Sequence, residues 1–395
     1  MLWFFRPRIS IQKPNGQKYY PKQVTASVTD AYPYSDAPYA QIELATNRSP
    51  ETAEYINPVE EDDIVRVQVS CRMSEKEKCV FVDLFEGRVR SIDGEYNTKN
   101  NTTVSCRGHI DEAAKLLIDE SKTWTGTIEA RTILGDLVTP ARHVSRLTWL
   151  NQAPHVDQSG VVSFTDPESA YATKADQTYL SSVFKDLEKE SGSTWKIGTK
   201  STYTVGGSLD KTYLTWKKLD TTPTNKYKAI QGTARYLGSN FEISIEDQAT
   251  QVKIKGDTPT SGTQYTGTAT DATAVARYGY KTDVDIYSQL QSNATCASIA
   301  AGILPSKVSA SISGTIKLVG TPEAHPGDMV YVRSRSTELN GAIVAGNFNV
   351  YRVRHNITSS SYTTEIQVGG IITDAYDLIK NIKTIAVTTK CNQVK

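Results

Sequence analysis

The stretch His325-Pro326-Gly327-Asp328-Met329-Val330-Tyr331-Val332 decides the fold that the sequence predicts. Pro-Gly-Asp is typical of a tight turn, and after it an apolar side chain recurs at every second position, at Val330 and Val332. This period indicates a β-strand with one buried face, because successive side chains of a strand point to opposite sides of a sheet. Segments 348–354 and 362–368 follow with similar alternation. The sequence therefore predicts three antiparallel strands that begin at an acidic turn.

The same order of features occurs near the N-terminus. The acidic turn Glu61-Asp62-Asp63 precedes an alternating segment, 64–69, and two further β-like segments contain Arg88-Val89-Arg90 and residues 102–106. Arg352-Val353-Arg354 follows its turn at nearly the distance at which Arg88-Val89-Arg90 follows the first turn. We interpret the two blocks as an internal repeat with the Arg-Val-Arg segments in equivalent positions. The alternative is that any two antiparallel sheets look alike at this level of description.

Length and composition exclude several classes of protein. The 395 residues correspond to about two or three domains, and 38% hydrophobic residues supply enough apolar material for real cores. The net charge is +1, so the basic surplus that meets nucleic-acid phosphates is absent, and we expect no specific nucleic-acid binding. The sequence contains no run of about 18 apolar residues, so we expect no membrane span.

Helical patterns are few. Helices are expected over about 111–121 and 127–138, after an N-terminal cap at Asp166-Pro167, and from a cap at Asp283 through about residue 303. The segment 256–273 is rich in Gly, Thr, Ser, Asp and Pro, and it is expected to be a linker or long loop.

These patterns predict a mainly β protein with a few helices (β + α), in which two tube-like antiparallel β-barrel modules flank a mixed α/β middle region. The expected parts are a first barrel module in residues 1–112, a middle α+β region in 113–255, a linker or long loop in 256–273, a second barrel module in 274–370 and a C-terminal tail in 371–395.

Motifs for catalysis, cofactors and metals are missing from the sequence. None of the five histidines forms a His-Glu-x-x-His or His-x-His pair, and neither a Gly-x-Ser-x-Gly elbow nor a phosphate-binding loop occurs. The five cysteines are odd in number and sparse, which argues against a disulfide framework. We therefore predict no catalytic, cofactor or metal site and expect that the protein is not an enzyme.

The Arg-Val-Arg segments provide the candidate interface residues Arg88, Arg90, Arg352 and Arg354. In each strand the two arginines share one face and the valine between them points to the core. Phe348 and Val350 have the parity of Arg352, so a β-bulge between Val350 and Arg352 is needed to bury both apolar sets. The arginines either meet carboxylates of a neighbouring subunit or only solubilise an outer face.

The C-terminal block resembles the tail baseplate hub family of bacteriophages, which includes the late-control D proteins and the hub half of type VI secretion spike proteins. The resemblance lies in the Pro326-Gly327-Asp328 turn, the following Leu339-Asn340-Gly341, a strand that runs from Phe348 to His355 and a strand that begins at Tyr362. The N-terminal block matches the family's first turn, although Asp62 stands in place of the usual glycine.

The resemblance implies a structural tail hub in a phage or phage-like injection system. Hubs of this family are trimers with two tube-like modules per protomer, so six modules form a ring that adapts a sixfold tail tube to a threefold spike. The implied partners are two further copies of the chain, a tail tube or tube-initiator protein, a central spike protein and other baseplate proteins. The implied location is the tail baseplate of the virion, after assembly in the host cytoplasm.

Two other functions remain open on the sequence. The 21 tyrosines and the β-rich pattern also fit a host-binding adhesin or lectin-like tail protein, because aromatic side chains provide platforms for sugars. A wall hydrolase is the third class, and the sequence provides no motif for it.

Overall fold

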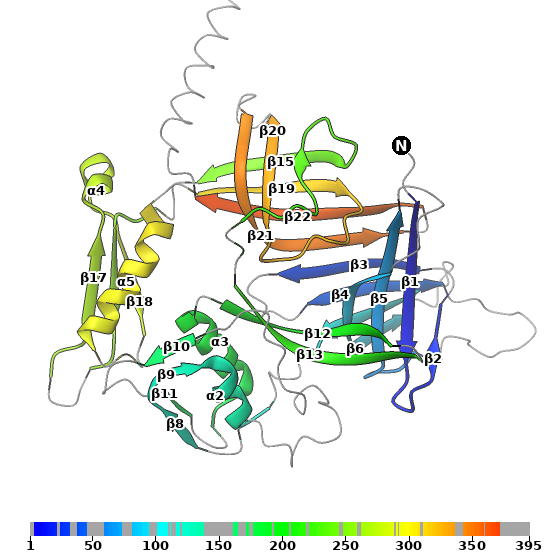
Figure 1. The fold of residues 1–395 in the computed structure, drawn as a ribbon, viewed down its shortest axis with the longest axis horizontal. Coiled ribbons are helices and arrows are strands. Elements are labelled where there is room, and N and C mark those ends of the chain that lie inside the picture. The colour runs from blue at the N-terminus through cyan, green and yellow to red at the C-terminus, as the bar shows by residue number, and fades with distance from the viewer. Residues whose placement is uncertain are drawn as a thin grey trace, which may run out of the picture.

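A computed structural model of the chain describes the following residues: 4–21, 24–31, 38–45, 59–72, 81–94, 101–109, 111, 116–118, 121–137, 161–164, 171–173, 177–191, 193–204, 207–218, 220, 222–244, 248–258, 262–287, 290, 292–308, 311–335, 343–358 and 360–371. Most of them belong to β-strands, so the expected mainly β fold with few helices is confirmed. The largest element is one 13-stranded sheet (Figure 1).

The first module of this sheet has the strand order β3-β4-β7-β6-β5-β1-β2, with antiparallel neighbours throughout. Val65, Val67 and Val69 of β5 are fully buried, as the alternation predicts. The strands are β1 (Phe4–Gln12), β2 (Lys18–Tyr19), β3 (Val24–Ala31), β4 (Tyr39–Ala45), β5 (Ile64–Arg72), β6 (Val82–Gly94) and β7 (Asn101–Gly108).

The second module repeats this order as β15-β19-β22-β21-β20, again antiparallel, and β14 then adds to β20 in parallel. Its first strands lie in the expected middle region, so the second module starts before residue 274. The strands are β14 (Ala229–Ile230), β15 (Tyr236–Ser244), β19 (Ser311–Val319), β20 (Met329–Arg335), β21 (Ile343–Ile357) and β22 (Tyr362–Ile371).

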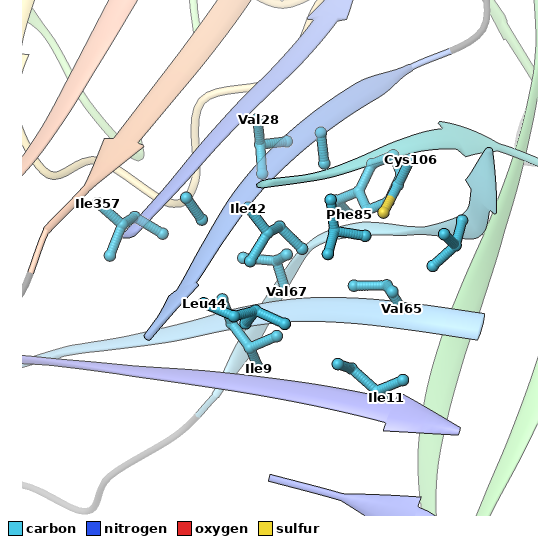
Figure 2. Close-up of a cluster of buried hydrophobic side chains, with 14 of the residues drawn as sticks. Ile9, Ile11, Val28, Ile42, Leu44, Val65, Val67, Phe85, Cys106 and Ile357 are labelled. Atoms are coloured by element: carbon cyan, nitrogen blue, oxygen red, sulfur yellow. The ribbon is translucent and has the colours of Figure 1, made fainter. Parts of the chain in front are cut away.

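In each module the sheet bends so that the strands at one end of the strand order cross those at the other end. Figure 1 shows β5 and β1 running across β3 and β4, and β20 running across β15, β19 and β22. The core of each module lies between these two sets of strands, and Figure 2 shows Val28 and Ile42 on one side of the first core and Ile9 and Ile11 on the other. Within the described residues no ladder joins β3 to β1 or β15 to β14. The sheet is therefore open, and the two closed barrels that the sequence predicts are not observed.

A small α/β unit is inserted between β15 and β19. It consists of β16 (Gln251–Lys255), β17 (Thr266–Thr270), α4 (Ala272–Tyr278), β18 (Thr282–Ile286) and α5 (Asn293–Val308), and its strands pair in the order β17-β16-β18. Val252 and Ile254 of β16 pack against Cys296 and Ala300 of α5. The expected linker over 256–273 is therefore wrong, because β17 and the start of α4 lie within it. Asp283 belongs to strand β18 and pairs with Val252, so it caps no helix, and the expected helix is present only from Asn293 onward, as α5.

The remaining elements lie between β7 and β14. They are β8 (Lys122–Trp124), β9 (Gly126–Glu129), α2 (Ala130–Leu137), β10 (Val161–Phe164), β11 (Tyr171–Thr173), α3 (Leu180–Ser191), β12 (Ser193–Thr204) and β13 (Gly207–Lys218). The expected helix over 111–121 is not continuous, because Leu117 forms a bridge with Tyr179. The expected helix over 127–138 starts as strand β9, where cross-strand pairing with β10 overrides the helical pattern. The cap at Asp166-Pro167 lies outside the described residues, and the helix it was expected to open begins only at Leu180.

Candidate assembly interface

The turns before β5 and β20 have the same hydrogen bonds. Asp63 N donates to Glu60 O at 3.3 Å, and Asp328 N donates to His325 O at 3.2 Å. Glu60 N donates to Asp63 Oδ2 at 2.8 Å, and His325 N donates to Asp328 Oδ2 at 2.9 Å. Each turn is thus closed both by the backbone and by the side chain of its aspartate.

The residue before each aspartate has a positive φ, 70° at Asp62 and 86° at Gly327. This left-handed conformation favours glycine, and aspartate is among the residues that tolerate it best. Asp62 therefore keeps the turn conformation that Gly327 adopts, and the two turns have the same geometry.

Each turn aspartate also has one buried partner from outside its three-strand block. Lys13 Nζ lies 3.0 Å from Asp63 Oδ2, and Tyr227 Oη donates to Asp328 Oδ2 at 3.1 Å. Burial disfavours the charged ammonium, but the hydrogen bonds and charges of Asp63 and Glu60 outweigh it and raise the pKa of Lys13. Burial and the Asp328 carboxylate raise the pKa of Tyr227. Sequence reasoning missed both partners, because neither lies near its aspartate in the chain.

The bulge that the sequence requires is present. The register of β21 on β22 shifts between Val350 and Arg352, and the register of β6 on β7 shifts between Val89 and Ser91. Val89 and Val350 are also the residues that bind the two turns, since each donates its N–H to the turn aspartate's carbonyl, at 3.0 and 2.8 Å.

Val89 is therefore equivalent to Val350, and the predicted equivalence of the two Arg-Val-Arg segments is wrong. Arg352-Val353-Arg354 corresponds to Ser91-Ile92-Asp93, one step past the bulge. The two segments follow their turns at similar distances along the chain, but the connection from β5 to β6 is longer than the connection from β20 to β21. Similar distances therefore do not mark equivalent positions. The four arginines do not form one repeated set.

Arg88 and Arg90 lie beside the first turn. Arg88 Nη1 donates to Asp62 O at 3.0 Å, and Arg90 Nη1 and Nε lie 3.4 Å from Asp62 Oδ1 and 3.2 Å from Asp111 Oδ2. Both are half-buried. Arg352 and Arg354 are exposed and share a face as expected, with Val353 fully buried between them.

The two modules are joined by direct pairing of β21 with β3. Arg352 lies opposite Ala31, Arg354 opposite Thr29 and Ile357 opposite Ala26. Ser27 Oγ accepts from Arg354 Nε at 3.1 Å and donates to Asn356 Oδ1 at 3.0 Å.

The joint is buried on its other face. His355 is 3% exposed, and its Nδ1 lies 2.9 Å from Tyr362 Oη and 3.2 Å from Thr364 Oγ1. Ile357 and Tyr362 contribute to the core of the first module. The modules therefore share a sheet and part of a core.

The described part of the chain contains no cluster of three or more His, Cys, Asp or Glu that could hold a metal. Cys106 is buried, and its burial raises the pKa of its thiol to about 12. Among the described helices, none is long and apolar enough to cross a membrane.

Comparisons with known proteins give one matching family model and several proteins of similar structure. A model of the YQBQ-like family matches residues 186–369. A search of curated proteins found no significant match. The 43 kDa tail protein of prophage MuSo2 from Shewanella oneidensis has a similar structure, with a TM-score of 0.60, 13% identity, and coverage of 92% of this chain and 98% of that one.

Two further tail proteins share the fold. The tail protein from Neisseria meningitidis MC58 superposes with a TM-score of 0.58 at 11% identity, over 92% of this chain and 96% of that one. Prophage tail protein gp18 from Listeria monocytogenes EGD-e superposes with a TM-score of 0.53 at 12% identity, over 96% and 99%. The expected resemblance to phage tail proteins is thus confirmed at the level of the fold.

Proposed function

We propose that this chain, which has the fold of prophage tail proteins, is a structural hub of a tail baseplate, and that three copies form a ring between a sixfold tail tube and a threefold spike. The observation that carries the proposal is the duplication itself. Both modules have the same strand order, the same aspartate turn and the same bulge. Three chains with two equivalent modules each present six similar units, which a sixfold neighbour requires.

The joint between the modules supports the ring. β21 and β3 pair edge to edge, so the two modules follow one another along a continuous sheet instead of packing face to face. Repetition of the same step in the same direction generates either a closed ring or an open helix. A threefold spike as neighbour favours the closed ring.

Of the four candidate arginines, the exposed pair Arg352 and Arg354 is better placed to contact a neighbouring protein. Their side chains face solvent beside the joint, whereas Arg88 and Arg90 interact with their own turn. We assign the exposed pair to contacts with carboxylates of a neighbouring tail component and the half-buried pair to the stability of the first module.

Mass measurement and imaging test the function. Light scattering and negative-stain images of the purified protein are expected to give three times the 43.5 kDa chain mass and a six-lobed ring. If the purified chain is monomeric, the same ring is expected on the axis of assembled tails. A monomer located away from the tail axis would contradict the hub, and binding of that monomer on a glycan array would favour the adhesin.

A further inference from the structure

The pairing of β21 with β3 joins the two modules inside one chain. Each module also has an equivalent strand edge that has no ladder partner among the described strands. β21 has β22 along one side, and along its other side it has first β20 and then β3. The second half of β21, residues 352–357, is thus a docking edge for β3. At this joint the edge of β21 in the second module pairs with β3, the strand at one end of the first module's strand order.

The equivalent docking edge in the first module lies on β6. Ser91, Ile92 and Asp93 correspond to Arg352, Val353 and Arg354, since both sets follow the bulge and pair with equivalent residues of β7 and β22. β5 pairs with β6 only as far as Arg88. Within the described residues, the edge of β6 from Ser91 to Gly94 has no ladder partner. Hairpin β12–β13 passes near β6 in Figure 1 but pairs only with itself.

The equivalent of β3 in the second module is β15. The alignment is set by the neighbouring strands β4 and β19, which pair with the equivalent strands β7 and β22. In this alignment the residues of β4 that correspond to Gly314, Ile316 and Leu318 of β19 are Ala40, Ile42 and Leu44. Val28 lies opposite Ala40 and Phe241 lies opposite Gly314, so these two residues are equivalent. β15 ends the sheet, and its outer edge has no ladder partner among the described strands.

We propose that the edge of β6 in one protomer pairs with the edge of β15 in the next, as an antiparallel ladder that copies the joint of β21 with β3. When the register of β21 on β3 is applied to β6 and β15, Ser91 lies opposite Ser244, Ile92 opposite Ile243, and Asp93 opposite Glu242. The occupant of each edge is a second copy of this chain. The inference rests on the proposed ring and names the strands that close it.

Charge distinguishes the joint between protomers from the joint inside the chain. Arg354 lies opposite a neutral residue, Thr29, inside the chain. In the proposed ladder two exposed carboxylates, Asp93 and Glu242, lie opposite each other. Like charges on directly opposed residues oppose pairing, and such charges are a common protection of sheet edges. The joint between protomers is therefore weaker than the internal joint.

A disulfide tests the register. The double variant Ser91→Cys/Ser244→Cys is expected to form links between chains on mild oxidation, and denaturing gels without reductant are expected to show dimers and trimers. The matched control is Ala31→Cys/Arg352→Cys at the internal joint, which is expected to link within one chain. Ser91→Cys/Asn240→Cys, displaced by four residues, and the single variants are expected to give no specific links between chains.

Charge reversal tests the same ladder without a disulfide. Asp93→Lys or Glu242→Lys alone is expected to tighten association by about two- to fivefold per joint, and the double reversal is expected to lose that gain. Equal effects of single and double reversals, together with no Ser91–Ser244 link, would overturn the proposed ladder. If wild-type protein nevertheless forms trimeric rings, the hub function stands. If no ring forms in solution or in tails, the hub function itself fails.

Discussion

Asp63 and Asp328 hold the same position in the two halves of the chain. Each accepts a hydrogen bond at Oδ2 from the backbone N–H three residues earlier, at 2.8 Å from Glu60 and 2.9 Å from His325. Each also offers its carbonyl to the valine at the bulge of the next strand, Val89 or Val350. This shared set of bonds ties the start of β5 and of β20 to the bulge in the middle of β6 and of β21.

Removal of the second turn aspartate is expected to destabilise the protein. Asp328→Ala leaves the Tyr227 hydroxyl and the His325 N–H without this acceptor, which costs about 3 kcal/mol of unfolding free energy. Denaturant unfolding followed by circular dichroism measures the change. Glu61→Ala, at an exposed position of the first turn, is the control and is expected to change stability by less than about 0.5 kcal/mol. Equal stability of the two variants would contradict the assigned role.

The left-handed position of the turn gives a second prediction. Gly327→Ala places a Cβ at a φ of 86° and is expected to cost about 1–2 kcal/mol. The equivalent Asp62 is not a glycine although its φ is 70°, so Asp62→Ala adds a smaller backbone penalty than Gly327→Ala and also loses its contact with Arg90. Thermal unfolding of both variants is the measurement, and a larger loss for Asp62→Ala than for Gly327→Ala would argue against equal turns.

Gly314 and Phe241 form a pair that replaces Ala40 and Val28 of the first module. A Cβ on Gly314 would lie 2.3 Å from Phe241 Cδ1, so Gly314→Ala is expected to cost about 1–3 kcal/mol. Gly314→Ala/Phe241→Val recreates the pair of the first module and is expected to recover part of that loss, with a coupling of about 0.5–3 kcal/mol. Rescue remains partial because Asn240 O also lies 2.7 Å from the added Cβ. A double-mutant cycle in denaturant measures the coupling, and strict additivity would contradict the packing equivalence.

The pairing of Lys13 with Asp63 predicts a pH dependence. Lys13→Met leaves the buried Asp63 carboxylate without its ammonium and is expected to cost about 3 kcal/mol near pH 8. Because the pKa of Lys13 is raised in the folded state, its stabilisation is complete below the unfolded value near 10.5 and is lost as the pH rises through the folded value. The difference between wild type and Lys13→Met should therefore shrink above about pH 10.5. Lys226→Met, at an exposed lysine, is the control and is expected to change the unfolding free energy by less than about 0.5 kcal/mol.

The two arginine pairs are expected to affect different properties, tail assembly for the exposed pair and stability for the half-buried pair. Arg352→Ser/Arg354→Ser is expected to leave the unfolding midpoint nearly unchanged and to reduce incorporation into tails, because both side chains are exposed. Arg88→Ser/Arg90→Ser is expected to lower stability by about 1–2 kcal/mol, since the two side chains bind the turn at Asp62. Tail assembly and thermal unfolding of both double variants are the measurements. Normal tails with the first variant would remove the exposed pair from the interface.

The amino-acid sequence by itself determined the local features of this protein. Alternating valines placed one face of β5 and β20 in a core, because a strand's side chains alternate whatever its partner is. The Gly-Asp and Asp-Asp turns were visible, because few residues tolerate a positive φ. Even the bulge after Val350 followed from the sequence, since Phe348, Val350 and Val353 cannot all face one core without it.

Only the tertiary structure decided which strands are partners. Alternation fixes the buried face of a strand but leaves its register free, and so the equivalence of Val89 with Val350 depended on hydrogen bonds to the distant turns. Only the first part of the helix expected from Asp283 is replaced by β18, because residues 283–286 pair with β16 and long-range pairing outweighs weak local propensity, whereas residues 293–303 are helical in α5. The joint of β21 with β3 joins segments from opposite ends of the chain, and no local pattern encodes such a contact.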